Sequence, residues 1–345
     1  MRWASFSIPA YGFYFHFIFP WTELLDNVMQ PALTRMTATS PPITAYEYKF
    51  GDEGYLLDYH GTKVFYPMYK SLPVVEHFQA DPKDVCIVTF PKAGTKFMSA
   101  VVWMILHDGD PASLLEGDTL ERKVPYLEFC LPGMKMEAMP AYQMNQQVPP
   151  RVFFTHLGYD ALPESIKTGA KIIYVSRNPK DVMVSTNYFF RSMPFAQCSS
   201  TMEETVRSFI DNTCAYAPFF DHVAGYRRRL SDMPNLVFTT YEEMLQDLKN
   251  VVKRVARLLE KDLDDVQISN IVRYCSHEQM KDNQLTNQSH LHKMGLRDFK
   301  VSPFMRKGIV GDWKNHFTPE VNQQVNEWIE REQRRLQQDL DGFQF

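Results

Sequence analysis

Residues 85–107 combine a short apolar run, a turn that contains glycine and an apolar segment of helical length. The run VCIVTF at 85–90 lies between Pro82 and Pro91 and predicts a buried strand, and residues 97–107 predict a helix. A turn with Gly94 between a strand and a helix directs backbone N–H groups and the positive end of the helix dipole to one point. This feature constrains the chain most, because it predicts an α/β unit with a site for an anion.

The turn itself, TFPKAGTKF at 89–97, adds two cations, Lys92 and Lys96, at this point. It differs from the GxxxxGK[ST] loop of nucleoside triphosphatases, because no glycine stands five positions before Gly94. A kinase or triphosphatase is therefore disfavoured. Taken alone, the turn also fits an ordinary strand–helix connection whose two lysines are solvated.

Two further apolar runs, KIIYVS at 171–176 and NLVFTTY at 235–241, predict strands that alternate with helices. Helices are expected after Pro179, which suits a first helical position, and over residues 242–262, whose apolar residues form one stripe. Such alternation implies a parallel sheet covered on both faces. We therefore expect an α/β fold, a single αβα domain with a central parallel sheet. Residues 108–150 and 280–306 are expected as long connections that cover bound ligands.

Composition excludes several classes of protein. The 37 Lys and Arg against 41 Asp and Glu leave a formal charge of −4, which argues against broad nucleic-acid binding. The five cysteines are scattered and form no CxxC pair, so we expect no zinc ribbon and no disulfide scaffold, but a reducing, cytoplasmic compartment. No cluster of residues suggests a metal, and His290 and His292 are expected as exposed loop residues.

The first sixty residues show no regular pattern, and no formal charge occurs from Trp3 to Pro20. Pro9, Gly12 and His16 interrupt this stretch, whereas a membrane span needs about twenty apolar residues. No small-residue cleavage site follows an aliphatic run, as a signal peptide would require. We therefore interpret residues 1–55 as an N-terminal extension of unknown role and expect no membrane anchor.

Two more basic motifs point to anion binding. RNPKDVMVS at 177–185 follows the apolar run 171–176, and neighbouring strand ends of a parallel sheet form one crevice in which ligands bind. RKGIVGDWKN at 306–315 gathers three cations and two glycines. Two strand-end sites with basic residues suggest a ligand with two separate anionic groups. Taken singly, the first motif also fits a capped helix and the second any basic turn.

Together the three motifs resemble those of the cytosolic sulfotransferase family, which read TYPKSGTTW, RNPKDVxVS and RKGxxGDWKNxFT. Further matches are FQADPKD at 78–84, KVPYLEF at 123–129, THL at 155–157 and TYEEM at 240–244. The resemblance runs from about residue 60 to 335 and keeps the order and spacing of the family. It implies a sulfotransferase domain over residues 56–335, followed by a C-terminal tail at 336–345.

The resemblance implies 3′-phosphoadenosine 5′-phosphosulfate (PAPS) as a co-substrate, with no metal. By position, the turn would hold the 5′-phosphosulfate, while arginine at the second and third motifs would pair with oxygens of the 3′-phosphate. The positions expected to contact the two phosphate groups are Lys92, Ala93, Gly94, Thr95, Lys96, Arg177, Ser185, Arg306, Lys307 and Gly308. Those expected near the adenine or beside it in the donor site are Phe97, Tyr241, Cys275 and His277.

The resemblance also assigns the chemistry. Lys92 would stabilise the leaving phosphate oxygen, since a cation there favours the transition state over the ground state. His156 would take the proton of an acceptor hydroxyl or amine that attacks sulfur in line, because an imidazole pKa near about 6.5 suits a base at neutral pH. Tyr126, Phe129 and Phe189 are expected to line an apolar acceptor pocket beside His156, which favours phenols, sterols and other flat alcohols.

The chain departs from the family pattern at five positions of the expected site. The family has Ser, Thr, Trp, Lys and Phe where this chain has Ala93, Lys96, Phe97, Phe154 and His277. These changes leave open an alternative, a catalytically weak protein that still binds the nucleotide.

The family's dimer motif is also degraded. Lys314 and Thr318 are followed by Pro319, and Gln323 stands at the position of a family Glu. A homodimer is therefore possible but not favoured.

Overall fold

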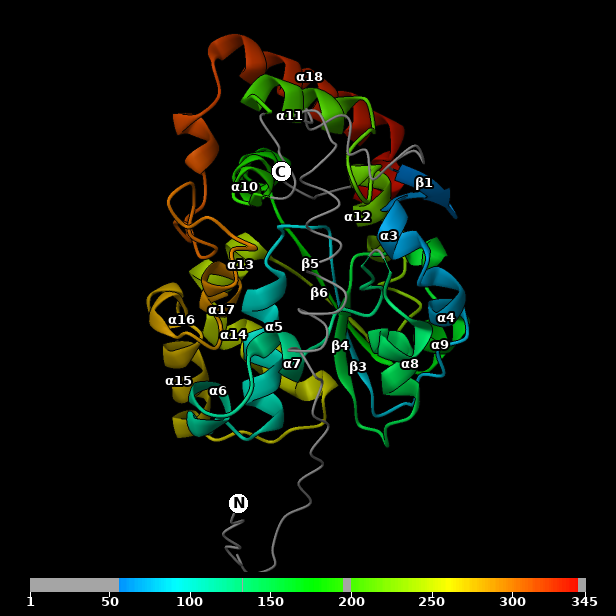
Figure 1. Cartoon of the computed structure of the whole chain (residues 1–345), viewed down its shortest axis with the longest axis vertical. Coiled ribbons are helices and arrows are strands. Elements are labelled where there is room, and N and C mark those ends of the chain that lie inside the picture. Colours follow the sequence, from blue (N-terminus) through cyan, green and yellow to red (C-terminus); the bar gives the residue numbers. More distant parts are fainter. Residues whose placement is uncertain (1–55, 132, 195–199, 341–345) are drawn as a thin grey trace, which may run out of the picture.

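The computed structural model describes residues 56–131, 133–194 and 200–340. Its centre is a parallel sheet in the order β4–β3–β5–β6 (Figure 1). The strands of this sheet are β3 (Val85–Thr89), β4 (Val152–Thr155), β5 (Lys171–Ser176) and β6 (Leu236–Thr240). The register aligns Ile87 with both Phe154 and Ile173. Because all four strands run the same way, their carboxyl ends meet at one edge.

Helices cover both faces of this sheet. Cys86 and Val88 of β3 belong to one core cluster, and Val85 and Ile87 belong to the other, the period of two of a strand buried on both sides. In Figure 1, α5, α14 and α15 lie to the left of the strands, and α4 and α9 lie to the right. These three layers confirm the predicted αβα fold. The helices are α3 (Tyr66–Tyr69), α4 (Leu72–Glu76), α5 (Thr95–Leu106), α6 (Ala112–Leu115), α7 (Leu120–Lys123), α8 (Pro140–Asn145), α9 (Glu164–Thr168), α10 (Pro179–Arg191), α11 (Met202–Ile210), α12 (Phe219–Arg227), α13 (Tyr241–Gln246), α14 (Leu248–Leu258), α15 (Asp265–Tyr274), α16 (His277–Asp282), α17 (Ser289–Lys293), α18 (Pro319–Arg335) and α19 (Gln337–Leu340).

The single helix expected over residues 242–262 is wrong. The segment forms two helices, α13 and α14, which meet at Asp247, where φ is −147° and ψ is 68°. The Asp247 side chain accepts a hydrogen bond from the Asn250 N–H at 3.1 Å, as an N-cap does. Buried Met244 and Leu248 lie four positions apart across the break, so the apolar spacing does not reveal it.

Three strands were not predicted. The segment at the start of the described chain forms a hairpin of β1 (Leu56–Tyr59) and β2 (Thr62–Phe65). His60 and Gly61 make its two-residue turn with φ of 49° and 78°, the left-handed geometry that hairpins favour. β4 spans only four residues, which is too short a run to stand out in the sequence.

The outer segments of the chain are only partly described. The expected N-terminal extension, residues 1–55, lies outside the described residues. Residues 336–340, expected within a C-terminal tail, include α19, whose Leu340 is buried in the core. No helix of the described residues is long and apolar enough to cross a membrane. The domain boundaries stay a prediction.

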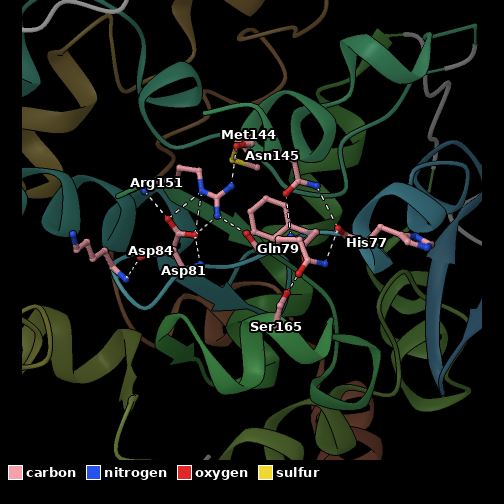
Figure 2. Close-up of polar contacts among 10 residues, drawn as sticks. His77, Gln79, Asp81, Asp84, Met144, Asn145, Arg151 and Ser165 are labelled. Carbon is pink, nitrogen blue, oxygen red and sulfur yellow. Dashed lines mark hydrogen bonds and ion pairs between the residues drawn. The ribbon is translucent and has the colours of Figure 1, made fainter. Parts of the chain in front are cut away.

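A buried ion pair joins the amino ends of β3 and β4 (Figure 2). The Asp84 carboxylate, fully buried, accepts hydrogen bonds from the Arg151 N–H at 2.8 Å and from Arg151 Nε at 3.1 Å. The guanidinium also donates to the carbonyl oxygens of Met144 at 2.9 Å and Gln79 at 2.6 Å. These contacts fix two strands relative to each other at the edge opposite their carboxyl ends.

Candidate active site

The candidate site lies at the carboxyl edge of the sheet. His156 directly follows β4, the turn with Lys92 follows β3, Arg177 follows β5 and Tyr241 follows β6. In the spatial order of the strands, the Lys92 turn therefore comes between His156 and Arg177, with Tyr241 beyond. Four segments that are distant in the sequence thus contribute to one crevice, at the place where ligands bind in open α/β sheets.

The turn after β3 has left-handed backbone at Lys92 and Gly94, where φ is 71° and 114°. Glycine is needed at position 94, because a Cβ atom there would come within 2.9 Å of the Tyr241 ring. α5 begins at Thr95, whose Oγ1 lies 2.7 Å from Thr89 Oγ1. The positive end of the α5 dipole therefore lies at this edge of the sheet.

Lys92 occupies a cationic and aromatic environment. Its Nζ lies 4.0 Å from the ring centre of Phe189 and 4.8 Å from that of Phe304. Burial lowers the pKa of Lys92 well below its ordinary value, and the charges of Arg297 and Arg177 lower it further. An ammonium group among cations and aromatic rings is stabilised by an added anion.

Arg177 connects the strand ends. Its Nη1 donates to the Lys92 carbonyl oxygen at 3.2 Å, its Nη2 donates to that of Ile309 at 3.4 Å, and its Cζ lies 4.1 Å from the ring centre of Tyr241. The buried Nε of Arg177 has no hydrogen-bond partner within the described part of the chain. Since buried donors are rarely left unpaired, this atom is free to bind an anion oxygen.

The loop at 306–311 closes another side of the site. Gly308 has φ of 66°, and a Cβ atom there would lie only 2.2 Å from Cδ2 of His277. Burial lowers the pKa of His277, and the charge of Lys281 adds to this effect. Only glycine therefore lets this loop pack on the imidazole ring.

The two cations of this loop are already paired. Arg306 Nη1 lies 2.5 Å from Asp312 Oδ2, and Lys307 Nζ lies 2.6 Å from Asp312 Oδ1. Burial alone would raise the pKa of Asp312, but hydrogen bonds from Lys307, Asn315 and Arg306 hold it below its ordinary value. A phosphate at Arg306 and Lys307 would therefore share these cations with a buried carboxylate.

His156 is held in one tautomer. Its Nδ1 lies 2.8 Å from the carbonyl oxygen of Thr89, which can only accept a hydrogen bond, so Nδ1 carries the proton and Nε2 the lone pair. Burial lowers the pKa of His156 to about 3, with smaller contributions from His222, Lys92 and Lys96, against the hydrogen bond to Thr89. The ring is therefore neutral at neutral pH.

A buried carboxylate supports the backbone of this histidine. Glu128 Oε1 accepts a hydrogen bond from the His156 N–H at 2.7 Å. Burial raises the pKa of Glu128 to about 7, even though hydrogen bonds from His156 and Thr155 lower it. The Tyr126 and Tyr216 hydroxyls share a short hydrogen bond, and their rings lie 5.1 Å and 5.4 Å from the His156 ring. The imidazole is thus fixed on several sides.

One cavity of about 720 Å³ contains all but one of the predicted site residues. Ala93, the exception, belongs to the turn and is fully buried. The predicted residues that line the cavity are Lys92, Gly94, Thr95, Lys96, Phe97, Tyr126, Phe129, His156, Arg177, Ser185, Phe189, Tyr241, Cys275, His277, Arg306, Lys307 and Gly308. Both long connections, 108–150 and 280–306, also contribute to its wall. Among the described residues, no group of three or more His, Cys, Asp or Glu is arranged to hold a metal.

Lys96 does not extend toward solvent. Its Nζ lies 3.3 Å from Glu121 Oε1 of α7 and 4.7 Å from the ring centre of Phe154. Gln288 Nε2 donates to the same Glu121 oxygen at 3.1 Å. The expectation that His290 is exposed is wrong, because it lies in α17, lines the cavity and buries its Nδ1 atom, whereas His292 is exposed.

Sequence reasoning missed several residues of the cavity wall. Arg297 and Phe304 approach Lys92 and Phe189 from the second connection, where no motif marks them. Glu128 could have been found, because it belongs to the motif KVPYLEF and is an acid within an otherwise apolar stretch. Glu121 and Gln288 carry no sequence signal, because their pairing depends on how two connections fold.

A parallel sheet covered on both faces, with basic residues and a buried neutral histidine at its carboxyl edge, is typical of α/β enzymes that act on anionic ligands. Residues 82–341 match the sulfotransferase domain, and the chain belongs to this family. The predicted family membership is thereby confirmed.

Individual relatives and solved structures agree with this family membership. The chain is 38% identical to mouse sulfotransferase 1B1 over 77% of this chain and 88% of the relative, and 35% identical to bovine sulfotransferase 1E1 over 80% and 93%. Retinol dehydratase in complex with androsterone and inactive cofactor PAP is similar at a TM-score of 0.71 and 25% identity, covering 82% of this chain and 88% of that one. Mouse sulfotransferase SULT7A1 complexed with PAP is similar at a TM-score of 0.64 and 28% identity. The match covers 81% of this chain and 94% of that one.

Proposed function

We propose that this protein transfers a sulfuryl group from PAPS to a hydroxyl or amine of a small acceptor with an aromatic or apolar body. The observation that carries the proposal is the meeting of His156, Lys92, Arg177 and Tyr241 at four adjacent strand ends on one cavity. The bound PAP of similar solved structures supports a donor of the same nucleotide class.

The residues at the strand ends fit such a donor. Lys92 and the start of α5 suit the 5′-phosphosulfate, and Arg177, whose buried Nε lacks a partner among the described residues, suits the 3′-phosphate. Glycine at position 308 lets the loop that carries Arg306 and Lys307 pack closely on His277. Phe97 and Tyr241, with ring centroids 6.1 Å apart, suit the adenine. The other predicted donor contacts that line the cavity are Gly94, Thr95, Ser185, Cys275, His277, Arg306 and Lys307. Two more were predicted: Lys96 lines the cavity and pairs with Glu121, and Ala93 is fully buried.

The donor supplies the sulfuryl group and a phosphate leaving group when it is bound. Lys92 stabilises the negative charge that develops on the leaving oxygen, which lowers the transition state more than the ground state. His156 takes the acceptor proton at Nε2, since its Nδ1 proton is bonded to Thr89. The pKa of His156, lowered by burial to about 3, lies below the expected value near about 6.5; it keeps Nε2 unprotonated before the acceptor arrives but makes the free imidazole a weaker base.

The acceptor pocket is predominantly aromatic near His156. Tyr126, Phe129 and Phe189 line the cavity there, and the Tyr126 ring stacks on Phe154 with centroids 4.7 Å apart. Such walls suit a flat apolar body, as in phenols and sterols.

The buried thiols of Cys86, Cys130, Cys214 and Cys275 are free, which supports a reducing, cytoplasmic location. The homodimer stays a prediction.

The first test is a calorimetric titration with adenosine 3′,5′-bisphosphate beside ADP, followed by a transfer assay with labelled PAPS and a panel of phenols and sterols. We expect the bisphosphate to bind at least tenfold more tightly than ADP and at least one acceptor to be sulfated. Binding without any transfer would favour the catalytically weak alternative. Folded protein that does not bind the bisphosphate contradicts the proposed donor site.

A further inference from the structure

One wall of the cavity departs from its aromatic character. Lys96 of α5, Glu121 of α7, and Gln288 and His290 of the second connection converge there; we call these four residues the polar cluster. They come from three separate segments. Lys96 and Gln288 are each at least nine-tenths buried, with 10% of the Lys96 side chain and 6% of Gln288 exposed. A polar group of this size in a cavity wall is costly unless its hydrogen bonds are completed.

The hydrogen bonds of the polar cluster are incomplete. Glu121 Oε1 accepts a hydrogen bond from Gln288 Nε2 and forms an ion pair with Lys96. In contrast, Glu121 Oε2 and Gln288 Oε1 accept no hydrogen bond within the described part of the chain. Apart from its ion pair, Lys96 Nζ has no hydrogen-bond acceptor among the same residues, and His290 Nδ1 has no partner there either. The cluster therefore presents unmet acceptors and an unmet donor beside one another.

The charges of the polar cluster cancel. Burial alone would raise the pKa of Glu121, but the charge of Lys96 holds it below its ordinary value, so the carboxylate is ionised opposite the Lys96 ammonium. Burial lowers the pKa of His290, which favours the neutral imidazole. A cluster without net charge gives no preference to an ammonium or a carboxylate ligand. It instead suits a group that donates and accepts at once.

Backbone geometry keeps Gln288 in place. Gln288 has φ of 60°, a left-handed conformation that is unfavourable for a residue with a side chain. This conformation precedes α17, which carries His290, so both side chains approach the cavity from one short segment. A strained residue that positions an amide oxygen with no donor among the described residues is characteristic of a binding site more than of a surface loop.

We propose that the polar cluster binds an uncharged hydroxyl group of the acceptor, separate from the group that receives the sulfuryl at His156. The ligand is thus an acceptor with an apolar body and a second hydroxyl, such as a diol. The hydroxyl would donate to Glu121 Oε2 or Gln288 Oε1 and accept from Lys96. This inference rests on the proposed function and narrows its acceptor class.

The test uses acceptors that differ only at the far end. 4-Hydroxybiphenyl is substituted at its 4′ position with hydroxymethyl, ethyl, aminomethyl or carboxyl, and each compound is titrated calorimetrically into protein saturated with adenosine 3′,5′-bisphosphate. Hydroxymethyl and ethyl have nearly the same shape, so their affinity ratio isolates the hydroxyl. We expect hydroxymethyl to bind at least tenfold more tightly than ethyl, because a site with unmet polar groups rejects the analogue that leaves them unpaired.

The variants Gln288→Met and His290→Phe remove polar atoms while keeping side-chain volume. We expect each variant to bind the hydroxymethyl compound less than about threefold more tightly than the ethyl compound. Glu116→Gln, an exposed acid just before α7, is the control and should keep the full ratio. Thermal melting of each variant checks that it is folded. If the bisphosphate itself does not bind, the proposed function fails before the cluster is tested.

Several results would overturn the inference. The wild-type protein could bind ethyl as tightly as hydroxymethyl, or bind none of the compounds. The variants could keep the wild-type ratio, which would make the cluster a purely internal network. Aminomethyl or carboxyl could bind most tightly, which would assign the cluster to a charged group. A tenfold loss of bisphosphate affinity in Gln288→Met would assign it to the donor instead.

Discussion

The Nδ1 atom of His156 lies 2.8 Å from the carbonyl oxygen of Thr89, and this contact joins the ends of β4 and β3. It determines the tautomer of the proposed base and directs its lone pair to Nε2. Because a main-chain carbonyl cannot change its hydrogen-bonding role, the tautomer is set by the fold and does not depend on pH. The reactive nitrogen is therefore ready before any ligand binds.

His156→Asn should separate this structural role from the chemical one. The Asn amide can still donate to the Thr89 carbonyl, but it has no basic nitrogen at the position of Nε2. General base catalysis typically contributes about 10²- to 10⁴-fold, so we expect kcat for sulfuryl transfer to fall by at least about 100-fold. Bisphosphate affinity and melting temperature should change little. Retained turnover in this variant would assign the proton to another acceptor.

Glu128→Gln should change how stability depends on pH. Burial raises the pKa of Glu128 to about 7, above the roughly 4.3 of an unfolded chain. The folded state then binds more protons between these values, so ionisation of Glu128 removes stability as the pH rises from about 4 through 7. In thermal melts from pH 5 to 8, the wild-type melting temperature should fall relative to that of the variant. Parallel curves would contradict the raised pKa.

Binding of the bisphosphate should take up a proton through Lys92. Burial and the charges of Arg297 and Arg177 lower the pKa of this lysine, and a bound anion raises it again. At any pH between the two values, the complex gains a proton, and affinity increases as the pH falls. Calorimetric titrations in two buffers with different ionisation enthalpies measure this uptake. The variant Lys92→Met should take up fewer protons on binding, because the contribution of the lysine is lost. Equal proton uptake by the variant and the wild type would show that Lys92 is not the group that gains the proton.

Gly308→Ala should weaken bisphosphate binding. A Cβ at this position would lie 2.2 Å from the His277 ring, so the loop at 306–311 must move away from its present path. We expect a loss of affinity of about tenfold by calorimetry, which corresponds to about 1.4 kcal/mol. His277→Ala in the same protein removes the clash and should restore part of the loss. An unchanged affinity in the single variant would show that the loop tolerates the shift.

Arg151→Met tests the ion pair at the opposite edge. The variant leaves the fully buried Asp84 carboxylate without its cation, and breaking a buried pair in this way typically costs about 3–5 kcal/mol. Urea unfolding should show this loss. The control is Lys249→Met, which breaks the exposed pair with Asp265 and should leave the midpoint nearly unchanged. Equal effects of the two variants would contradict the structural role of Arg151.

The sequence predicted the elements whose signal is local. The runs of β3 and β5 were predictable because strands buried on both faces are mostly apolar. β6 was predictable from its apolar residues LVF, although it is only partly buried. The turn before α5 was predictable because a strand–helix turn needs a residue such as Gly94. The break at Asp247 was hidden because the residues on either side keep the same apolar spacing. Local patterns thus gave the order of the strands along the chain, while their order in space required the structure.

The candidate site was predictable where motifs follow strand ends and not where connections fold back. Lys92, His156 and Arg177 belong to motifs, and the structure brings them to one cavity. Lys96 was expected to reach a phosphate or solvent, and its pairing with Glu121 depends on where α7 lies. No spacing rule relates residues 96, 121 and 288, because they meet only through tertiary packing.

The four strand ends have a consequence for how acceptor choice can change. Hydrogen-bonded strands lie about 4.8 Å apart, so the distance from the end of β4 to the end of β6 is set at about 14 Å by the backbone alone. The groups proposed for chemistry stand on this rigid edge, whereas the polar cluster is built mainly from the two connections. Exchanging only Glu121, Gln288 and His290 of these connections, while Glu128 and Arg297 beside the reacting groups are kept, should therefore redirect the enzyme to new acceptors. Reaction and selectivity are thus encoded in different residues, even where these residues share one connection.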